Sequence, residues 1–259
     1  MKSIIVIPAR YGSTRFPGKS LARLQGRPMI QWVWEAASRS RLCEQVIVAT
    51  DDERIADVAA KFGADVIMTK KSHRSGTDRI AEVADKVSAQ LYLNVQGDEP
   101  LLSPGAVDDL IRGMAESPRI PIGTLAHPVE NEAEWRSPEV VKVVVNRHNE
   151  ALYFSRSPLP FMRTWDPKAK LLRHVGIYAY RPRALEEFVA LKPSALEQAE
   201  SLEQLRALEH GMMIQVIETK YRCFGVDTPS DLARVEEEMR RQAKAAKARP
   251  QVKRRKSKK

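Results

Sequence analysis

The start of the chain decides the fold, through the segment SIIVIPARYGSTRFPGKS at residues 3–20. Residues 3–9 are mostly apolar and β-branched, which is typical of a buried strand. A polar loop follows at 10–19, and residues 28–38 then show the apolar periodicity of an amphipathic helix. A strand, a polar loop and a helix in this order predict the first unit of an α/β fold with a parallel sheet.

The same alternation continues through the first 130 residues. Ligands bind beyond the carboxyl ends of the strands in such sheets, and here each predicted strand ends in a polar loop. We therefore predict a doubly wound, mostly parallel, Rossmann-like sheet in which four loops meet at one crevice. The further strands lie at 45–50, 64–68 and 91–95, the further helices at 53–62, 77–87 and 104–114, and the loops at 10–19, 51–52, 70–78 and 96–99.

The second half has a different pattern, with strands but no regular helices between them. It predicts a strand-rich antiparallel extension at 120–180 that acts as a lid or a dimerisation layer. We predict one domain over residues 1–240 and a disordered basic tail over 241–259. The strands lie at 122–127, 140–146, 151–155 and 174–181, followed by a helix at 199–210, a strand at 214–218 and a last helix starting near Pro229.

The net charge of +10 comes from the end of the chain. Residues 240–259 hold 11 of the 43 Lys and Arg and no Asp or Glu, so the remainder is nearly neutral. Binding of this tail to nucleic acid or to an anionic membrane surface is an alternative, but we favour a merely solvated end.

Composition also bears on the compartment of the protein. No apolar run approaches the roughly 20 residues of a membrane span. The two cysteines, Cys43 and Cys223, fit a reducing compartment. We expect a cytoplasmic protein without a membrane span.

The loop 10–19 carries the strongest chemical signal, because it combines two arginines, a lysine, hydroxyl side chains and two glycines. Glycines let a ligand approach the backbone, exposed N–H groups bind anions, and the cations supply charge, so the loop predicts a polyphosphate site. A basic surface loop without function is the simpler alternative. Gly18-Lys19-Ser20 resembles the end of a P-loop, but Ser13 occupies the position where that motif needs glycine.

Two aspartates follow predicted strands, Asp98 in NVQGDEP at 94–100 and Asp227 in GVDTP at 225–229. Magnesium binds through one or two carboxylates together with substrate phosphates, so the pair predicts a Mg²⁺ site. The alternatives are a turn residue for Asp98 and a helix cap for Asp227, a role for which Thr228 competes.

Together these segments resemble the sugar-nucleotide cytidylyltransferases, and among them the 3-deoxy-manno-octulosonate cytidylyltransferase (CMP-Kdo synthetase) family. The resemblance covers residues 3 to about 240, and the basic tail lies outside it. It rests on IPAR at 7–10, STRFPGK at 13–19, SGTDR at 75–79, NVQGDEP at 94–100, YFSR at 153–156, HVGIY at 174–178, LEQLR at 202–206 and GVDTP at 225–229.

The resemblance implies a reaction in which CTP and Kdo give CMP-Kdo and pyrophosphate, an activation step for lipopolysaccharide assembly. It also implies that Asp98 and Asp227 bind magnesium and form the catalytic set together with Arg10 and Lys19. The implied nucleotide-binding residues are Arg10, Ser13, Arg15, Lys19, Ser75, Gly76 and Gln96, and the implied sugar-binding residues are Gln96, Arg156, His174, Tyr178, Glu203 and Gln204.

Several alternatives stay open at this point. A cytidylyltransferase for sialic acid would share the phosphate loop, although the motifs in the second half favour Kdo. A non-catalytic RNA-binding protein that uses the basic tail is the alternative from another class. A homodimer through residues 120–180 is also predicted, because apolar strands such as 140–145 need cover.

The sugar-site residues carry alternatives of their own. Arg156 could equally be a structural ion-pair partner, and His174 a buried structural histidine. Glu203 and Gln204 would point about 100° apart on a helix, so both can face one ligand only near a helix end.

Overall fold

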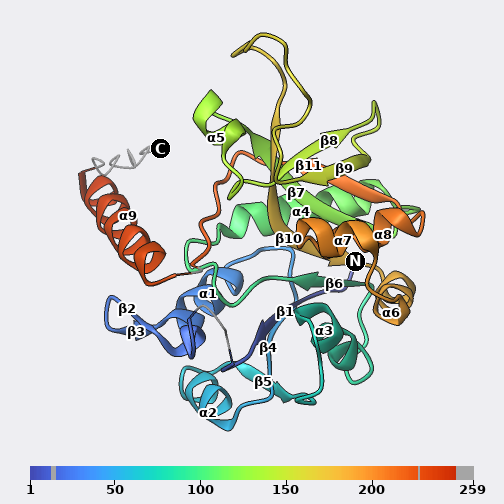
Figure 1. Cartoon of the computed structure of the whole chain (residues 1–259). Coiled ribbons are helices and arrows are strands. Elements are labelled where there is room, and N and C mark those ends of the chain that lie inside the picture. Colours follow the sequence, from blue (N-terminus) through green and yellow to red (C-terminus); the bar gives the residue numbers. More distant parts are fainter. Residues whose placement is uncertain (13–15, 227, 249–259) are drawn as a thin grey trace, which may run out of the picture.

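The computed structural model describes residues 1–12, 16–226 and 228–248, with side chains up to Arg241. Within these ranges the fold is built on a nine-stranded sheet whose main path runs β11-β7-β10-β6-β1-β4-β5 (Figure 1). The sheet is formed by β1 (Ser3–Ala9), β4 (Gln45–Thr50), β5 (Asp65–Met68), β6 (Leu91–Asn94), β7 (Ile122–Pro128), β8 (Lys142–Val145), β9 (Ala151–Ser155), β10 (Leu172–Tyr180) and β11 (Ile214–Glu218). A small hairpin of β2 (Arg23–Leu24) and β3 (Arg27–Pro28) stands apart from it.

The sheet is mixed but mostly parallel. β6, β1, β4 and β5 run parallel to one another, and β11 runs parallel to β7. β10 lies between β6 and β7 and is antiparallel to both. The carboxyl ends of β1, β4, β5 and β6 therefore meet at one edge, as the sequence predicted.

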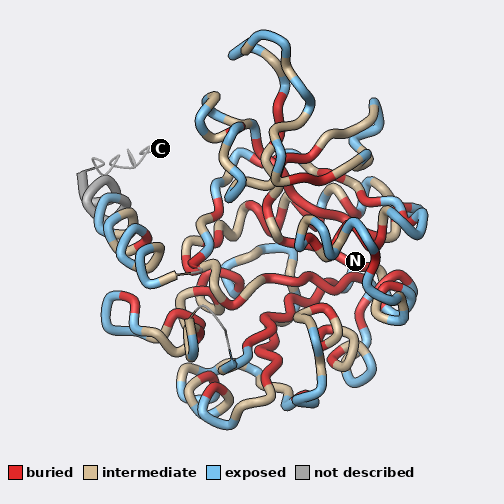
Figure 2. The backbone as a smooth tube through the Cα atoms, in the orientation of Figure 1, coloured by how far each residue is buried: buried red, intermediate tan, exposed pale blue. Residues whose placement is uncertain are grey.

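Helices cover both faces of the sheet, which confirms the doubly wound class. Successive side chains of a strand point to opposite faces, and Ile4 and Val6 enter one core while Ile5 and Ile7 enter the other. The first core receives α3, α6 and α8, and the second receives α1, α2 and α4. The central strands between these helices are largely buried (Figure 2). The helices are α1 (Met29–Ala37), α2 (Glu53–Lys61), α3 (Gly76–Ala84), α4 (Pro104–Glu116), α5 (Glu132–Arg136), α6 (Pro182–Ala190), α7 (Ala195–Glu200), α8 (Gln204–Glu209) and α9 (Pro229–Ala248), with a short 3₁₀ turn η1 (Lys19–Leu21).

The strand-rich region pairs in antiparallel fashion, as predicted, and it extends the main sheet itself. β7 and β10 belong to the main path of the sheet, and the β8–β9 hairpin branches from β10. α5 lies within the region, and α6 and α7 follow β10, although the sequence pattern gave no regular helices there. Periodicity predicts a strand but not its neighbours, because the pairing of distant segments depends on tertiary packing. The roles of this region as a lid or a dimer interface stay predictions.

The predicted single helix at 199–210 is wrong. α7 ends at Glu200, and Ser201 adopts the left-handed conformation with φ 53° and ψ 47°. A left-handed residue ends a helix, so the chain starts again as α8 at Gln204. This break places Glu203 and Gln204 at a helix start.

The end of the chain is more helical than predicted. α9 begins at Pro229, as expected, but runs to Ala248 and so passes the predicted domain boundary at residue 240. Residues 249–259 of the predicted tail lie outside the described residues. Among the described helices, none is both long and apolar enough to cross a membrane.

Candidate active site

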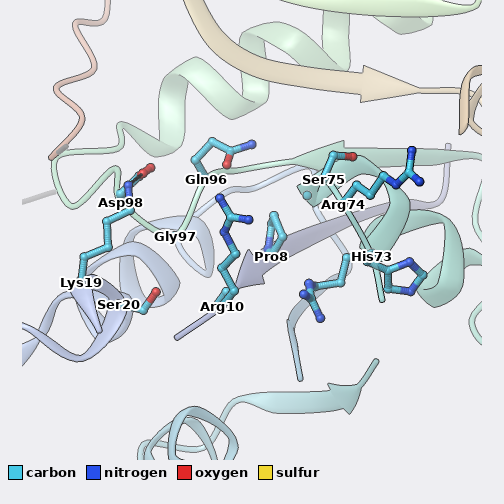
Figure 3. A pocket seen from close by; sticks show the side chains of 13 residues that line it. Pro8, Arg10, Lys19, Ser20, His73, Arg74, Ser75, Gln96, Gly97 and Asp98 are labelled. Carbon is cyan, nitrogen blue, oxygen red and sulfur yellow. Dashed lines mark hydrogen bonds and ion pairs between the residues drawn. The ribbon is translucent and has the colours of Figure 1, made fainter. Parts of the chain in front are cut away.

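A pocket of about 290 Å³ lies at the carboxyl ends of β1 and β6 and faces the start of α3 (Figure 3). Four Lys and Arg side chains and one carboxylate belong to its described lining, so its positive field suits a polyanion. The lining comprises Pro8, Ala9, Arg10, Lys19, Ser20, His73, Arg74, Ser75, Gly76, Arg79, Gln96, Gly97 and Asp98.

Gly97 brings the end of β6 close to β1 in this pocket. A Cβ at residue 97 would lie 3.2 Å from the backbone oxygen of Pro8, which is tighter than ordinary side-chain contacts. Glycine therefore allows the turn that carries Gln96 and Asp98 to pass directly beside the end of β1.

Lys19 and Asp98 form an ion pair at one end of the pocket, with side-chain exposures of 18% and 22%. The backbone oxygen of Asp98 accepts a hydrogen bond from the Val226 amide at 2.8 Å. Lys19 Nζ also lies 3.5 Å from the Val226 carbonyl oxygen. The structure thus brings the phosphate loop, the end of β6 and the segment before Asp227 to one point.

Three of the predicted site residues, Ser13, Arg15 and Asp227, lie outside the described residues, and their roles stay predictions.

The ligand atoms that the described part of the site offers fit magnesium. Asp98 offers a carboxylate that already attracts a cation and borders a cationic pocket, and carboxylate oxygen is the ligand type that Mg²⁺ prefers.

Ser75 and Gly76 present the start of α3 to the pocket. Ser75 Oγ accepts from the Asp78 amide at 3.2 Å, and Asp78 Oδ2 accepts from the Ser75 amide at 3.0 Å. This capping box follows directly from the Ser-x-x-Asp spacing and fixes the first turn of the helix. A helix start of this kind, with its exposed N–H groups, suits an anionic ligand.

A second pocket, of about 1030 Å³, shares Arg10, Ser75 and Gln96 with the first and extends to Glu203. Thr77 Oγ1 donates to Glu203 Oε2 at 2.7 Å, and burial raises the pKa of the Glu203 carboxyl. Arg10, Ser75, Gly76 and Gln96, the predicted nucleotide-binding residues that line this pocket, therefore border the same space as Glu203.

Glu203 precedes α8 and Gln204 is its first residue. Both thus lie at a helix end, where two successive side chains can face one ligand. Gln204 is buried, and its Nε2 has no hydrogen-bond partner among the described residues.

His174 and Tyr178 lie together on β10, with ring centroids 5.4 Å apart. Tyr178 pairs across the sheet with Asn94, which borders the larger pocket. Thr124 Oγ1 lies 2.8 Å from the Ile177 carbonyl oxygen, to which it donates, and 3.0 Å from His174 Nε2. The hydroxyl then accepts from His174, which assigns the proton of the neutral ring to Nε2.

Burial lowers the pKa of His174 to about 3, and the nearby Arg173 acts in the same direction. The folded state therefore keeps the ring neutral, whereas the unfolded chain takes up a proton below pH 6.5. Stability from this site is complete above pH 6.5 and is lost as the pH falls toward 3, at up to about 1.4 kcal/mol per pH unit.

We predict that acid destabilises the wild-type protein more steeply than the variant His174→Gln. Urea unfolding measured from pH 7 down to 4.5, which is about two units below the unfolded-state pKa of His174, gives the two slopes. Parallel stability curves would show that His174 already binds a proton in the folded protein.

Arg156 has structural partners. Its backbone amide and Nε donate to Glu200, and its Nη1 donates to the Pro138 carbonyl oxygen at 3.2 Å. It does not belong to the described lining of either pocket. Its sugar-binding role stays a prediction, and the structural alternative considered for it has direct support.

The structure adds His73, Arg74 and Arg79 to the site, none of which the sequence singled out. Arg79 is buried, lines the pocket and pairs with Asp51 at 3.1 Å. Asp51 belongs to the predicted loop 51–52 after β4, so this ion pair links that loop to the pocket. His73 and Arg74 directly precede the SGTDR motif at 75–79, and Arg79 ends it. Their position in or beside this motif is the feature of the sequence that could have identified them.

The chain matches the model of the Cytidylyltransferase family over residues 4–214. It is 49% identical over 250 residues to a 3-deoxy-manno-octulosonate cytidylyltransferase of Geobacter sulfurreducens, which covers 93% of this chain and 100% of the relative. An Escherichia coli protein of the same name is 50% identical over 234 residues, covering 90% of this chain and 94% of the relative. This chain belongs to the 3-deoxy-manno-octulosonate cytidylyltransferase family.

Solved structures agree with this membership. One described as CMP:2-keto-3-deoxy-manno-octonic acid synthetase complexed with CTP matches with a TM-score of 0.88 and 48% identity, over 93% of this chain and 100% of that chain. A 4-diphosphocytidyl-2C-methyl-D-erythritol synthase from Anaerococcus prevotii matches with a TM-score of 0.60 and 14% identity, and shows the shared fold alone. The predicted fold class and family are confirmed.

Proposed function

We propose that this chain transfers CMP from CTP to 3-deoxy-D-manno-octulosonate (Kdo), giving CMP-Kdo and pyrophosphate for lipopolysaccharide biosynthesis. One observation carries the proposal: the cationic pocket of Arg10 and Lys19, with Asp98, occurs in a chain about half identical to proteins named for this reaction. A relative solved with CTP supports the choice of nucleotide.

The proposed reaction joins two anions. A sugar hydroxyl oxygen attacks the α-phosphorus of CTP, the bond to the bridging oxygen of the β-phosphate breaks, and pyrophosphate leaves. Arg10 and Lys19 line the pocket and would hold the triphosphate in line for this attack. Their charges also stabilise the negative charge that develops in the transition state, and the reaction needs no covalent enzyme intermediate.

Magnesium is the proposed cofactor, with Asp98 and Asp227 as its protein ligands. When bound, it would neutralise phosphate charge and lower the pKa of the attacking hydroxyl. The hydrogen bond from Val226 to Asp98 supports the pairing, since Val226 directly precedes Asp227. Lys19 neutralises the Asp98 carboxylate in the structure described.

The sugar is proposed to lie toward the larger pocket. Gln96 and Glu203 border it. Gln204 Nε2, which has no hydrogen-bond partner among the described residues, would donate to a sugar oxygen. His174 and Tyr178 are proposed to contact the sugar from β10, and Arg156 to bind its carboxylate. Kdo and sialic acid are both acidic keto sugars, so the shape of this pocket sets the preference.

Pyrophosphate release tests the proposal directly. With CTP, Kdo and magnesium we expect turnover, and with ATP or UTP in place of CTP only a small fraction of it. A chelator of magnesium should abolish release. Equal release with all four nucleotides, or with sialic acid in place of Kdo, would contradict the assigned substrates but leave the family membership intact.

We also propose that the protein is a cytoplasmic homodimer assembled through residues 120–180. Leu152 on β9 is 61% exposed and Phe161 is 84% exposed, and large apolar side chains of this kind suit an interface. Light scattering at micromolar concentration should give a mass near twice the 29.3 kDa of one chain. A mass near that of one chain would contradict the dimer.

A further inference from the structure

A small hydrophobic cluster joins α9 to the catalytic edge of the sheet. We call it the α9 cluster. It is centred on four buried residues, and it is separate from the two cores that flank the sheet. Its members are Leu24, Met29, Val226 and Val235, with Phe16, Trp32, Leu101, Phe224, Leu232 and Met239 packed against them.

The α9 cluster connects three segments that carry or adjoin proposed catalytic groups. The first runs from Phe16 through Trp32 and includes Lys19. The second contains Val226, whose amide binds the backbone of Asp98 and whose carbonyl oxygen lies 3.5 Å from Lys19 Nζ. The third is α9, which contributes Val235. The α9 cluster therefore packs Phe16 and Leu24, which flank Lys19 in the chain, together with Val226 and α9.

Polar contacts support the same docking. Trp32 Nε1 donates to the Leu24 carbonyl oxygen at 2.8 Å and ties α1 to the β2–β3 hairpin. The Gln25 amide at the tip of that hairpin donates to Glu236 Oε1 on α9 at 2.9 Å. α9 thus holds the segment after the phosphate loop through both apolar packing and a hydrogen bond.

α9 is set at the periphery of the molecule, and its described outer face is exposed (Figures 1 and 2). Val235 is its one fully buried residue among those whose side chains are described, at 1% exposure. An element held by so few buried contacts opens locally at lower free energy than the whole protein unfolds.

We propose that Val235 is a positioning residue: the docking of α9 through Val235 holds Lys19 and Val226 in the arrangement that the reaction needs. Undocking of α9 would then stop turnover while the sheet stays folded. This inference rests on the proposed function for its kinetic part, but its structural part does not depend on any substrate.

The experiment compares Val235→Ala with the control Val216→Ala. Val216 is also 1% exposed but lies on the edge strand β11 and belongs to another core. Both variants lose the same two methyl groups from a buried site. Hydrogen exchange without nucleotide or metal measures the structural part of the proposal. Steady-state kinetics at a temperature where both variants are folded measures the kinetic part.

We expect Val235→Ala to accelerate amide exchange about tenfold in both peptides, 16–29 and 222–239. Val216→Ala should leave the exchange rates of these two peptides unchanged. We expect kcat to fall at least about fivefold in Val235→Ala only, with KM for CTP nearly constant, and Val235→Ile to restore it. Equal kcat losses in the two alanine variants would overturn the proposal, as would faster exchange of α9 with unchanged exchange at 16–29. If the wild type showed no turnover, the proposed function would fail, and exchange at 16–29 would still decide the coupling.

Discussion

Asp98→Asn should lower kcat by roughly a hundredfold or more, the scale of losing one preorganised electrostatic group. The physical reason is that asparagine keeps the shape of the side chain but removes the charge that is proposed to hold magnesium. CTP affinity should fall much less, because the triphosphate is proposed to be held mainly by Arg10, Arg15 and Lys19. Steady-state kinetics and calorimetric titration with CTP separate these two effects.

Asp227→Asn should resemble Asp98→Asn if the two aspartates share one ion. The double variant should then be little worse than either single one, since removing either ligand already disables the shared site. Backbone contacts should persist in all three variants, because the bond between Asp98 and Val226 joins main-chain atoms. Lower thermal stability of Asp227→Asn with unchanged turnover would instead identify Asp227 as a helix cap.

Lys19→Met should lower kcat/KM for CTP by roughly two to three orders of magnitude. The Lys19 side chain is 18% exposed at the pocket, so water only poorly replaces its charge. The loss should include a raised KM, in contrast to Asp98→Asn, because Lys19 would contact the triphosphate in the ground state too.

Lys61→Met provides the matched control for that variant, since Lys61 is exposed on α2 and lies outside the pocket. It should change kcat/KM by less than about twofold, the usual range for a surface charge far from a site. Unchanged CTP kinetics in Lys19→Met would remove Lys19 from the proposed catalytic set and leave its ion pair with Asp98 as a structural contact.

The sequence alone determined the first half of the fold and the edge at which the pocket lies. β1 and β4 have the predicted bounds, and Arg10, Lys19, Ser75, Gln96 and Asp98 meet as expected. These features are local: a β-branched run forms a strand, and the polar residues directly after parallel strands share one edge. The local pattern was sufficient for these residues because each lies in a loop that follows a strand of the parallel sheet.

Only the tertiary structure decided the second half. Periodicity could not predict the place of β10 between β6 and β7. Nor could it predict the break at Ser201 that sets Glu203 before α8, or the structural partners of Arg156. The docking of α9 through Val235 belongs with them. Each depends on contacts between segments far apart in the chain, and the free energy of such contacts depends on how the whole core packs rather than on the spacing of neighbouring residues.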